Sequence, residues 1–159
     1  NQQVEEKDQQ VVVLKENLAA ANFEMSRLNA RLDTVATQNK QQRDLIDSQT
    51  EELNTAYYAV GNYKTLEENQ VLTKQGGVIG IGSTKTLAKD FNKDYFTRID
   101  ITKTTSIPLN IEDDDVKLVS SHPSDSYNWL KEGDKVTALE ISNPQRFWKS
   151  SKYLVVLVD

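Results

Sequence analysis

The sequence predicts an α+β protein in which a long coiled-coil helix over residues 1–56 precedes a small, mainly β domain over residues 57–159. Two observations predict this class. Apolar residues recur every seven positions along the first segment, which contains no glycine or proline before Gly61. All six glycines, all three prolines and most aromatic residues follow Tyr57, where short apolar runs are bounded by turn-forming residues. The change of composition near residue 60 predicts two separate regions.

The first element is justified by a heptad repeat that does not slip. A strict seven-residue repeat keeps one apolar seam facing a partner helix when the helices supercoil. A long surface helix lying on its own domain is the alternative, but it would show a wider apolar stripe. The predicted oligomerisation seam consists of positions a and d: Val11, Leu14, Leu18, Met25, Leu28, Leu32, Val35, Asn39, Ile46 and Leu53.

Such a narrow seam predicts that the chain associates with itself, because a lone helix with so thin a stripe buries too little surface to stay ordered. Asn39 at position a favours a parallel homodimer, since two such side chains can pair and fix the register. Alanine and glutamine at several d positions leave a trimer or an antiparallel pair open. Nucleic acid is a poor partner, because the chain has 19 basic against 24 acidic residues and no basic patch.

The β domain is predicted from short apolar segments. Tyr57–Gly61 fits a strand or a frayed helix end, and we favour the strand; Lys64–Val71 fits a short helix. Alternating apolar residues predict half-buried strands, whereas the continuous apolar run near the C-terminus predicts a central one. About 100 residues can hold one core, so we expect a sandwich or barrel with one short helix. The expected strands are Val78–Ile81, Phe96–Ile101, Ser106–Ile111, Val116–Ser120, Lys135–Ile141 and Tyr153–Val158.

The only histidine lies in a segment with the residue types of a hydrolytic triad. His122 is followed by Ser124, Asp125 and Ser126. A triad usually brings its members together from separate elements, whereas Pro123 with nearby serine and aspartate is typical of a turn. With one histidine and no cysteine, the usual zinc-ligand spacings are absent. We therefore expect a non-enzymatic protein without catalytic residues, metal or cofactor.

Two further segments resemble ligand-binding loops without matching them. The glycine-rich run over residues 76–86 lacks a lysine directly after the second glycine of a P-loop, and it does not fit GxGxxG. The acidic run Glu112-Asp113-Asp114-Asp115 has carboxylates that calcium prefers, but not the EF-hand spacing. Turn glycines around a short strand and a solvated acidic loop are the favoured interpretations.

Aromatic residues cluster in the C-terminal third and are the remaining binding candidates. Phe147, Trp148 and Tyr153 precede or begin the last strand, and core packing is the favoured interpretation for them. Trp129 has polar neighbours at 128 and 131, so it is the best candidate for exposure, together with Tyr127. Exposed aromatic residues favour protein interfaces. Trp129 and Tyr127 are therefore the predicted binding surface.

Four segments carry a resemblance to a known family. They are Ser121–Tyr127, Leu139–Ile141 and Phe147–Val156, with Tyr57–Gly61 directly after a long coil. In these segments the chain resembles coiled-coil envelope lipoproteins of Bacteroides-type bacteria, a family that includes collagen-binding glycoprotein adhesins. The resemblance covers most of residues 55–159 and carries over no catalytic or ligand-contacting residue.

The resemblance implies an envelope protein, lipid-anchored at the outer membrane or held in the periplasm, whose β domain binds collagen or another extracellular or envelope protein. The chain begins inside a helical pattern, so we expect a preceding segment with the lipoprotein signal as its membrane anchor. Asp33-Thr34-Val35 matches a short O-glycosylation signal of these bacteria, which makes Thr34 a candidate glycoprotein site. A structural envelope spacer or assembly scaffold without matrix binding is the alternative function.

Overall fold

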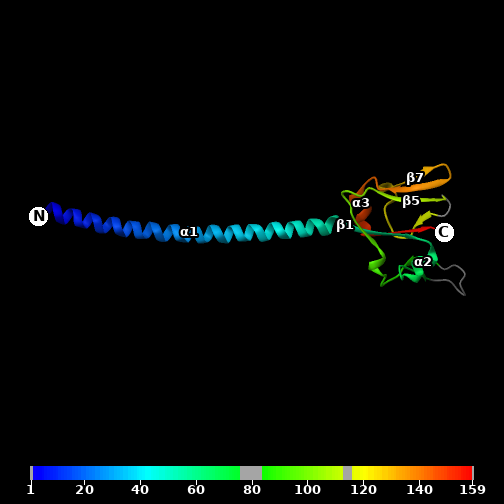
Figure 1. Ribbon diagram of the computed structural model, residues 1–159, viewed down its shortest axis with the longest axis horizontal. Helices are drawn as coiled ribbons and strands as arrows, with labels where there is room; N and C mark the ends of the chain where they lie inside the picture. Colours follow the sequence, from blue (N-terminus) through cyan, green and yellow to red (C-terminus); the bar gives the residue numbers. More distant parts are fainter. Residues whose placement is uncertain (1, 76–83, 113–115, 159) are drawn as a thin grey trace. The chain divides into compact units, whose positions relative to one another are not determined.

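The computed structural model describes residues 2–75, 84–112 and 116–158. It contains a long N-terminal helix followed by a small, mainly β region (Figure 1), so the predicted α+β class is confirmed. The chain divides into two compact units, residues 1–50 and residues 51–159. The last helical turn of the long helix belongs to the second unit.

Helix α1 (Gln2–Asn54) has 53 residues, and at about 1.5 Å rise per residue it spans about 80 Å. No residue in it removes a backbone donor or adds glycine flexibility, so nothing interrupts its hydrogen-bond ladder. The hydroxyls of Ser26, Thr34 and Thr37 donate to the carbonyl four residues earlier, which keeps these polar side chains compatible with the helix. All its described residues up to Leu53 are exposed in the single chain.

The helix ends at Asn54, and strand β1 (Thr55–Gly61) follows without a linker. Tyr57–Gly61 is therefore a strand, as favoured from the sequence. Ala56 and Val60 continue the heptad count, yet both lie in β1, where Ala56 is completely buried. Strand pairing takes precedence over the repeat here, so α1 ends at Asn54, before the predicted end of the coil at residue 56.

A four-stranded sheet lies at the centre of the β domain, in the order β4 (Thr97–Asp100), β1, β9 (Tyr153–Val158) and β6 (Val116–Leu118). Strands β1 and β9 are parallel, and the outer pairs are antiparallel. Alternate residues of β9 enter two different cores, so Leu154 and Val155 are both completely buried. The continuous apolar run is thus the predicted central strand.

One face of this sheet packs against a three-stranded antiparallel sheet in the order β5 (Ser106–Glu112), β8 (Lys135–Glu140) and β7 (Asn128–Glu132). Helix α3 (Pro144–Ser150) adds Phe147 and Trp148 to the same core. In register across the smaller sheet, Ile107, Leu139 and Trp129 form one apolar row. These two sheets form the predicted sandwich, and their shared core lies between them.

The other face of the central sheet is covered by α2 (Tyr63–Glu68) and by the hairpin of β2 (Leu72–Gln75) and β3 (Thr84–Leu87). In Figure 1, β5 and β7 lie on one side of β1 and α2 lies on the other. The second core includes Ala59, Leu66, Val71, Leu72, Phe96, Val155 and Leu157. The β domain therefore has three layers.

Several elements differ from the sequence predictions. Helix α2 stops at Glu68 rather than continuing to Val71, because Gln70 has a left-handed backbone (φ 58°). Strands β2, β3 and β7 and helix α3 were not predicted. The predicted strand Val78–Ile81 lies outside the described residues, and so do residues 76–83 of the glycine-rich run and the aspartates at 113–115.

Candidate functional site

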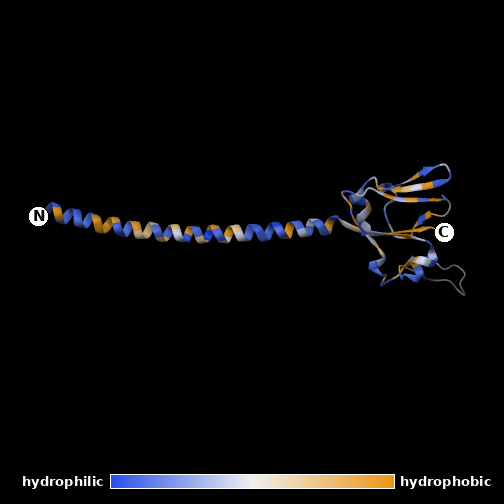
Figure 2. Cartoon of the chain, viewed as in Figure 1, coloured by the Kyte–Doolittle hydropathy of each residue, from blue (hydrophilic) through white to orange (hydrophobic). Residues whose placement is uncertain are grey.

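The most extensive candidate surface is the predicted seam on α1. Its large apolar side chains, from Val11 to Leu53, are each between 46% and 68% exposed in the single chain. Figure 2 shows apolar residues distributed along α1 and most frequent in its N-terminal half. On a straight α-helix a seven-residue repeat drifts by about 20° per heptad. A left-handed supercoil removes this drift, so the seam suits pairing of supercoiled helices.

The last turn of α1 is fastened to the β strands of its own unit. Arg98 on β4 donates to Glu51 Oε1 at 2.7 Å and to Thr55 Oγ1 at 3.2 Å. Lys152 Nζ donates to the Leu53 carbonyl at 2.6 Å, and the Ile101 amide donates to the Asn54 carbonyl at 2.8 Å. The last carbonyls of a helix have no partner within it. The β domain therefore supplies the C-terminal cap of α1.

Within the last turn of α1, the side chain that contacts β4 lies opposite the seam. Glu51 occupies heptad position f, which faces away from the seam. The hydrogen bond that Arg98 donates to Glu51 raises the pKa of Arg98. Leu53 at position a is 68% exposed although it belongs to the same unit as the strands. The contacts of the β domain thus leave the last apolar position of the seam open.

His122 is enclosed between aromatic rings and two hydrogen bonds. Its ring stacks on Phe147 with a centroid distance of 4.0 Å and meets Trp148 edge-on at 5.7 Å. Nδ1 lies 2.9 Å from the Phe147 carbonyl, and Nε2 lies 3.0 Å from Ser120 Oγ. A carbonyl only accepts, so Nδ1 carries the proton and neutral Nε2 accepts from Ser120.

The same hydroxyl of Ser120 also accepts a hydrogen bond from the Val155 amide at 2.9 Å. It therefore extends the contact between β6 and β9 past the last paired strand residue. Burial lowers the pKa of His122, although hydrogen bonds with the backbone of Phe147 and Tyr153 oppose this shift. The neutral histidine and its serine form a closed structural link, in which both ring nitrogens are engaged.

The remaining triad-type residues are directed elsewhere. Asp125 pairs with Arg146 at 2.9 Å, and the Ser126 hydroxyl donates to the Pro123 carbonyl. Residues 124–126 form a 3₁₀ turn, which agrees with the turn interpretation. Among the hydrogen bonds of the described residues, no carboxylate orients His122, so these side chains are not arranged as a catalytic triad.

Tyr127 and Trp129, the predicted binding surface, are half-buried against the first core. Their rings meet at 5.9 Å, and Tyr127 also contacts Phe147 at 5.7 Å. Strand β7 turns Trp129 toward the core and its neighbour Leu130 outward, where Leu130 is 40% exposed. Sequence reasoning missed Leu130 because it missed β7, although alternation along this strand was the available signal.

The ring of Tyr63 on α2 contacts the β2–β3 hairpin. The ammonium groups of Lys74 and Lys85 lie 4.9 and 5.0 Å from the centre of the Tyr63 ring, and the two lysines are register partners. Burial and a hydrogen bond to Glu67 raise the pKa of Tyr63 to about 12. One ring thus accommodates two neighbouring cations by cation–π contact, which is a structural role.

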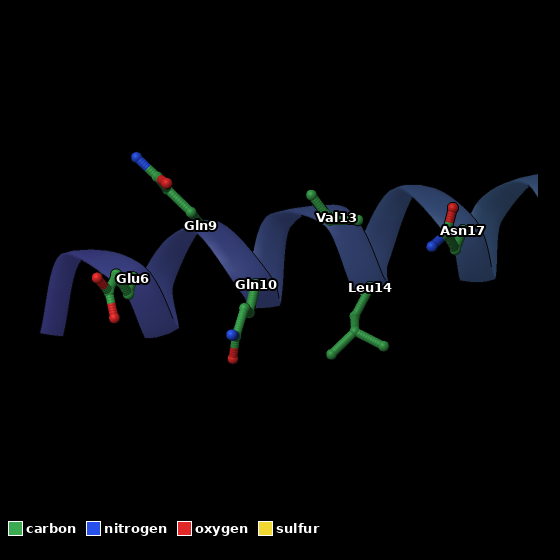
Figure 3. Close-up of a pocket in the computed structure, with 6 residues that line it drawn as sticks. All are labelled: Glu6, Gln9, Gln10, Val13, Leu14 and Asn17. Carbon is green, nitrogen blue, oxygen red and sulfur yellow. The ribbon is translucent and has the colours of Figure 1, made fainter. Parts of the chain in front are cut away.

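Two surface hollows offer little chemistry. Figure 3 shows the first on α1, where Gln9 and Val13 project to one side of the helix and Gln10 and Leu14 to the other. It is a depression between exposed side chains. The second, about 340 Å³, lies in the β domain and has no charged lining residue. Its lining consists of Asn54, Ile101, Thr102, Thr105, Ser142, Asn143, Pro144 and Gln145.

Two of the polar side chains that line this second hollow already have partners. The Thr102 hydroxyl bonds to Asp100, and Asn143 Oδ1 accepts from the Arg146 amide at the start of α3.

Across residues 2–75, 84–112 and 116–158, no three metal-ligating side chains come together. No helix within these ranges is both long and apolar enough to cross a membrane. Thr34, the candidate glycosylation site, is exposed.

Comparisons with known proteins identify no relative: no family model, curated protein or solved structure matches the chain significantly. The resemblance to envelope lipoproteins therefore stays a prediction from the sequence.

Proposed function

We propose that this chain is a non-enzymatic structural protein that pairs through α1 into a parallel two-stranded coiled coil and carries its β domain directly after the coil. The observation that supports this proposal is the exposed seam that continues to Leu53, where the β domain contacts the opposite side of the helix at Glu51. A partner helix can therefore cover every apolar layer of the seam without displacing the contacts of Arg98.

Burial of the seam supplies the driving force. Burying a leucine or valine side chain contributes about 1.5–3 kcal/mol relative to leaving it exposed. The dense apolar layers between Val11 and Val35 would provide most of this energy, whereas Asn39, Gln42 and Gln49 weaken the seam toward its C-terminal end. Pairing also offsets the entropy cost of ordering so long a helix.

Asn39 supports the parallel arrangement, because in that arrangement it meets its counterpart and the two amides can bond to each other. The flanking positions add no repulsion. In a parallel pair Gln10 would face Lys15, Glu24 would face Asn29, and Gln38 would face Arg43, so each contact joins at most one charged residue. The orientation therefore depends on the buried asparagine rather than on ion pairs.

Sedimentation equilibrium of the full chain tests this proposal, with Leu32→Lys as the seam variant and Thr37→Lys as the matched control. Leu32 is a seam residue, whereas Thr37 lies at the outward position f. Loss of about 2–3 kcal/mol at each of two buried sites would weaken pairing roughly a thousandfold or more. A monomeric wild-type protein would contradict the proposal. A stable trimer would show that the coil is three-stranded rather than two-stranded.

Display from a bacterial envelope and binding of collagen or another matrix protein are the finer version of this function, predicted from the resemblance. Two β domains in one dimer would raise avidity for a repetitive ligand without new contacts. Binding of the wild-type chain to a collagen and matrix panel should then exceed that of the Leu32→Lys monomer. No saturable binding by either form would contradict the adhesin version and leave the spacer or scaffold version.

A further inference from the structure

The face of α1 opposite the seam is also apolar over three helical turns. Val12, Val13 and Phe23 are 53%, 54% and 69% exposed, and they occupy heptad positions b, c and f. Exposed Ala19 and Ala20 lie between them. We call these five residues the outer patch. Pairing through positions a and d leaves b, c and f facing water, so the proposed dimer does not cover the patch.

The outer face of the remaining helix is different. Between residues 38 and 52, the b and f positions are Lys40, Asp44, Asp47 and Glu51, all charged, as expected for a solvated face. An aromatic ring at position f and two valines beside it are not expected on such a face. A helix that is apolar on opposite sides is normally covered on both sides. The outer patch therefore requires a second layer of contact.

Two charged residues on the same face indicate what covers the patch. Glu16 and Arg27 lie on the same outer face, before and after the patch centre. Arg27 is 59% exposed and already pairs with Glu24 of its own helix at 2.9 Å, and its guanidinium has further donors available. A parallel second copy in register would place Glu16 against Glu16 and Arg27 against Arg27. An antiparallel copy would instead place Glu16 against Arg27 twice, by symmetry.

The same antiparallel alignment brings complementary shapes together. In an antiparallel pair of helices, the numbers of two facing residues always have the same sum. The alignment that places Glu16 opposite Arg27 therefore also places Phe23 opposite Ala20 of the other copy. A methyl side chain leaves room for the aromatic ring and lets the helix axes approach. Ala30 then lies opposite Val13. Both the charges and the sizes of the side chains thus fit one alignment.

We infer that the outer patch binds the outer patch of an antiparallel second copy, joining coiled-coil dimers side by side. This inference rests on the proposed seam pairing, because that pairing leaves the patch exposed. A two-stranded coil has two such patches on opposite sides. Each contact is symmetric, but the set does not close on itself, so association continues beyond two dimers.

Sedimentation velocity and equilibrium over a wide concentration range test the inference on the full chain. The average mass of the wild-type protein should rise above the dimer mass with concentration, whereas Phe23→Gln should remain at the dimer mass. Glutamine is a good helix former, so circular dichroism should report unchanged helix content. Glu16→Arg or Arg27→Glu alone should weaken association about tenfold, since repulsion replaces attraction at two sites, and the double variant should restore it.

Each outcome separates this inference from the seam pairing beneath it. A wild-type mass that stays at the dimer at every concentration overturns the outer-patch contact and leaves the coiled coil intact. A monomeric wild type overturns both. If Phe23→Gln is monomeric, Phe23 belongs to the dimer seam and the patch assignment is wrong. If the charge-swapped double variant fails to recover association, the antiparallel alignment is wrong.

Discussion

Replacing Ser120 with alanine should destabilise the β domain through a single hydroxyl that serves two partners. Ser120 Oγ accepts from the Val155 amide at 2.9 Å and lies 3.0 Å from His122 Nε2. Val155 is completely buried in the central strand. In Ser120→Ala its amide would lose this acceptor, and an unsatisfied buried donor costs about 1–3 kcal/mol. With the lost histidine contact, we expect a loss of about 2–3 kcal/mol.

The measurement is urea unfolding followed by tryptophan fluorescence at pH 8. Both tryptophans, Trp129 and Trp148, lie in the β domain, so the signal reports this unit without a contribution from α1. The matched control is Ser121→Ala, because Ser121 is exposed and should change stability by less than about 0.5 kcal/mol. Equal stability of the two variants would refute the argument that Ser120 is a structural acceptor.

Burial lowers the pKa of His122 in the folded protein. As the pH falls through the ordinary histidine pKa of about 6.5, the unfolded chain therefore binds more protons at this residue than the folded chain does. The β domain should lose stability as the pH falls from about 7.5, and the slope of stability against pH should be shallower in His122→Gln. Asn39→Val should raise the thermal midpoint of α1 measured by circular dichroism, because valine adds apolar burial. It should also broaden the mass distribution in sedimentation, because the register constraint is removed. A single dimeric species would show that Asn39 does not set the register. Arg98→Ala should leave the urea-unfolding midpoint of the β domain almost unchanged, because both side chains of its ion pair with Glu51 are more than half exposed. A clear drop in the midpoint would mean that the contacts of Arg98 with Glu51 and Thr55 contribute more than an exposed ion pair.

The parts of the fold that could be predicted from sequence are those whose signal is local and periodic. A seven-residue repeat defines α1 without knowledge of any distant residue, and the uninterrupted apolar run of β9 indicates burial on both faces. The end of α1 was less predictable. Ala56 and Val60 fit the heptad, but strand pairing places them in the sheet. Ala56 lies opposite Ile99 of β4 and Val60 lies opposite Val156 of β9, and both competing contacts come from residues far away in sequence.

The elements that were missed are stabilised mainly by their neighbours. Strand β2 reads Leu-Thr-Lys-Gln and has one buried residue, Leu72, so its alternation is too weak to stand out. It forms because β3 pairs with it and α2 packs on it. Helix α3 did carry a local signal, since Asn143 caps it and Pro144 occupies its first turn, as is common at helix starts. That signal could have placed Phe147 on a helix.

The candidate sites divide in the same way. The seam is readable because each of its residues repeats a position, whereas the roles of His122 and Ser120 depend on a strand that reaches them from residue 155. Exposure was predicted for Trp129, but β7 turns Trp129 toward the core and its neighbour Leu130 outward, because neighbouring residues of a strand face opposite sides. Sequence adjacency placed His122 beside Asp125, but folding pairs Asp125 with Arg146 instead.

The outward positions of α1 are used differently along its length, and this difference argues for assembly by the helix itself. At Glu51 position f meets Arg98 of the β domain through a charged contact, which is compatible with water. At Phe23 the same position is an exposed aromatic ring, which is not. A helix needed only as a spacer could be polar at both places. The apolar outer residues in the N-terminal half therefore support the proposed contact between copies at the outer patch.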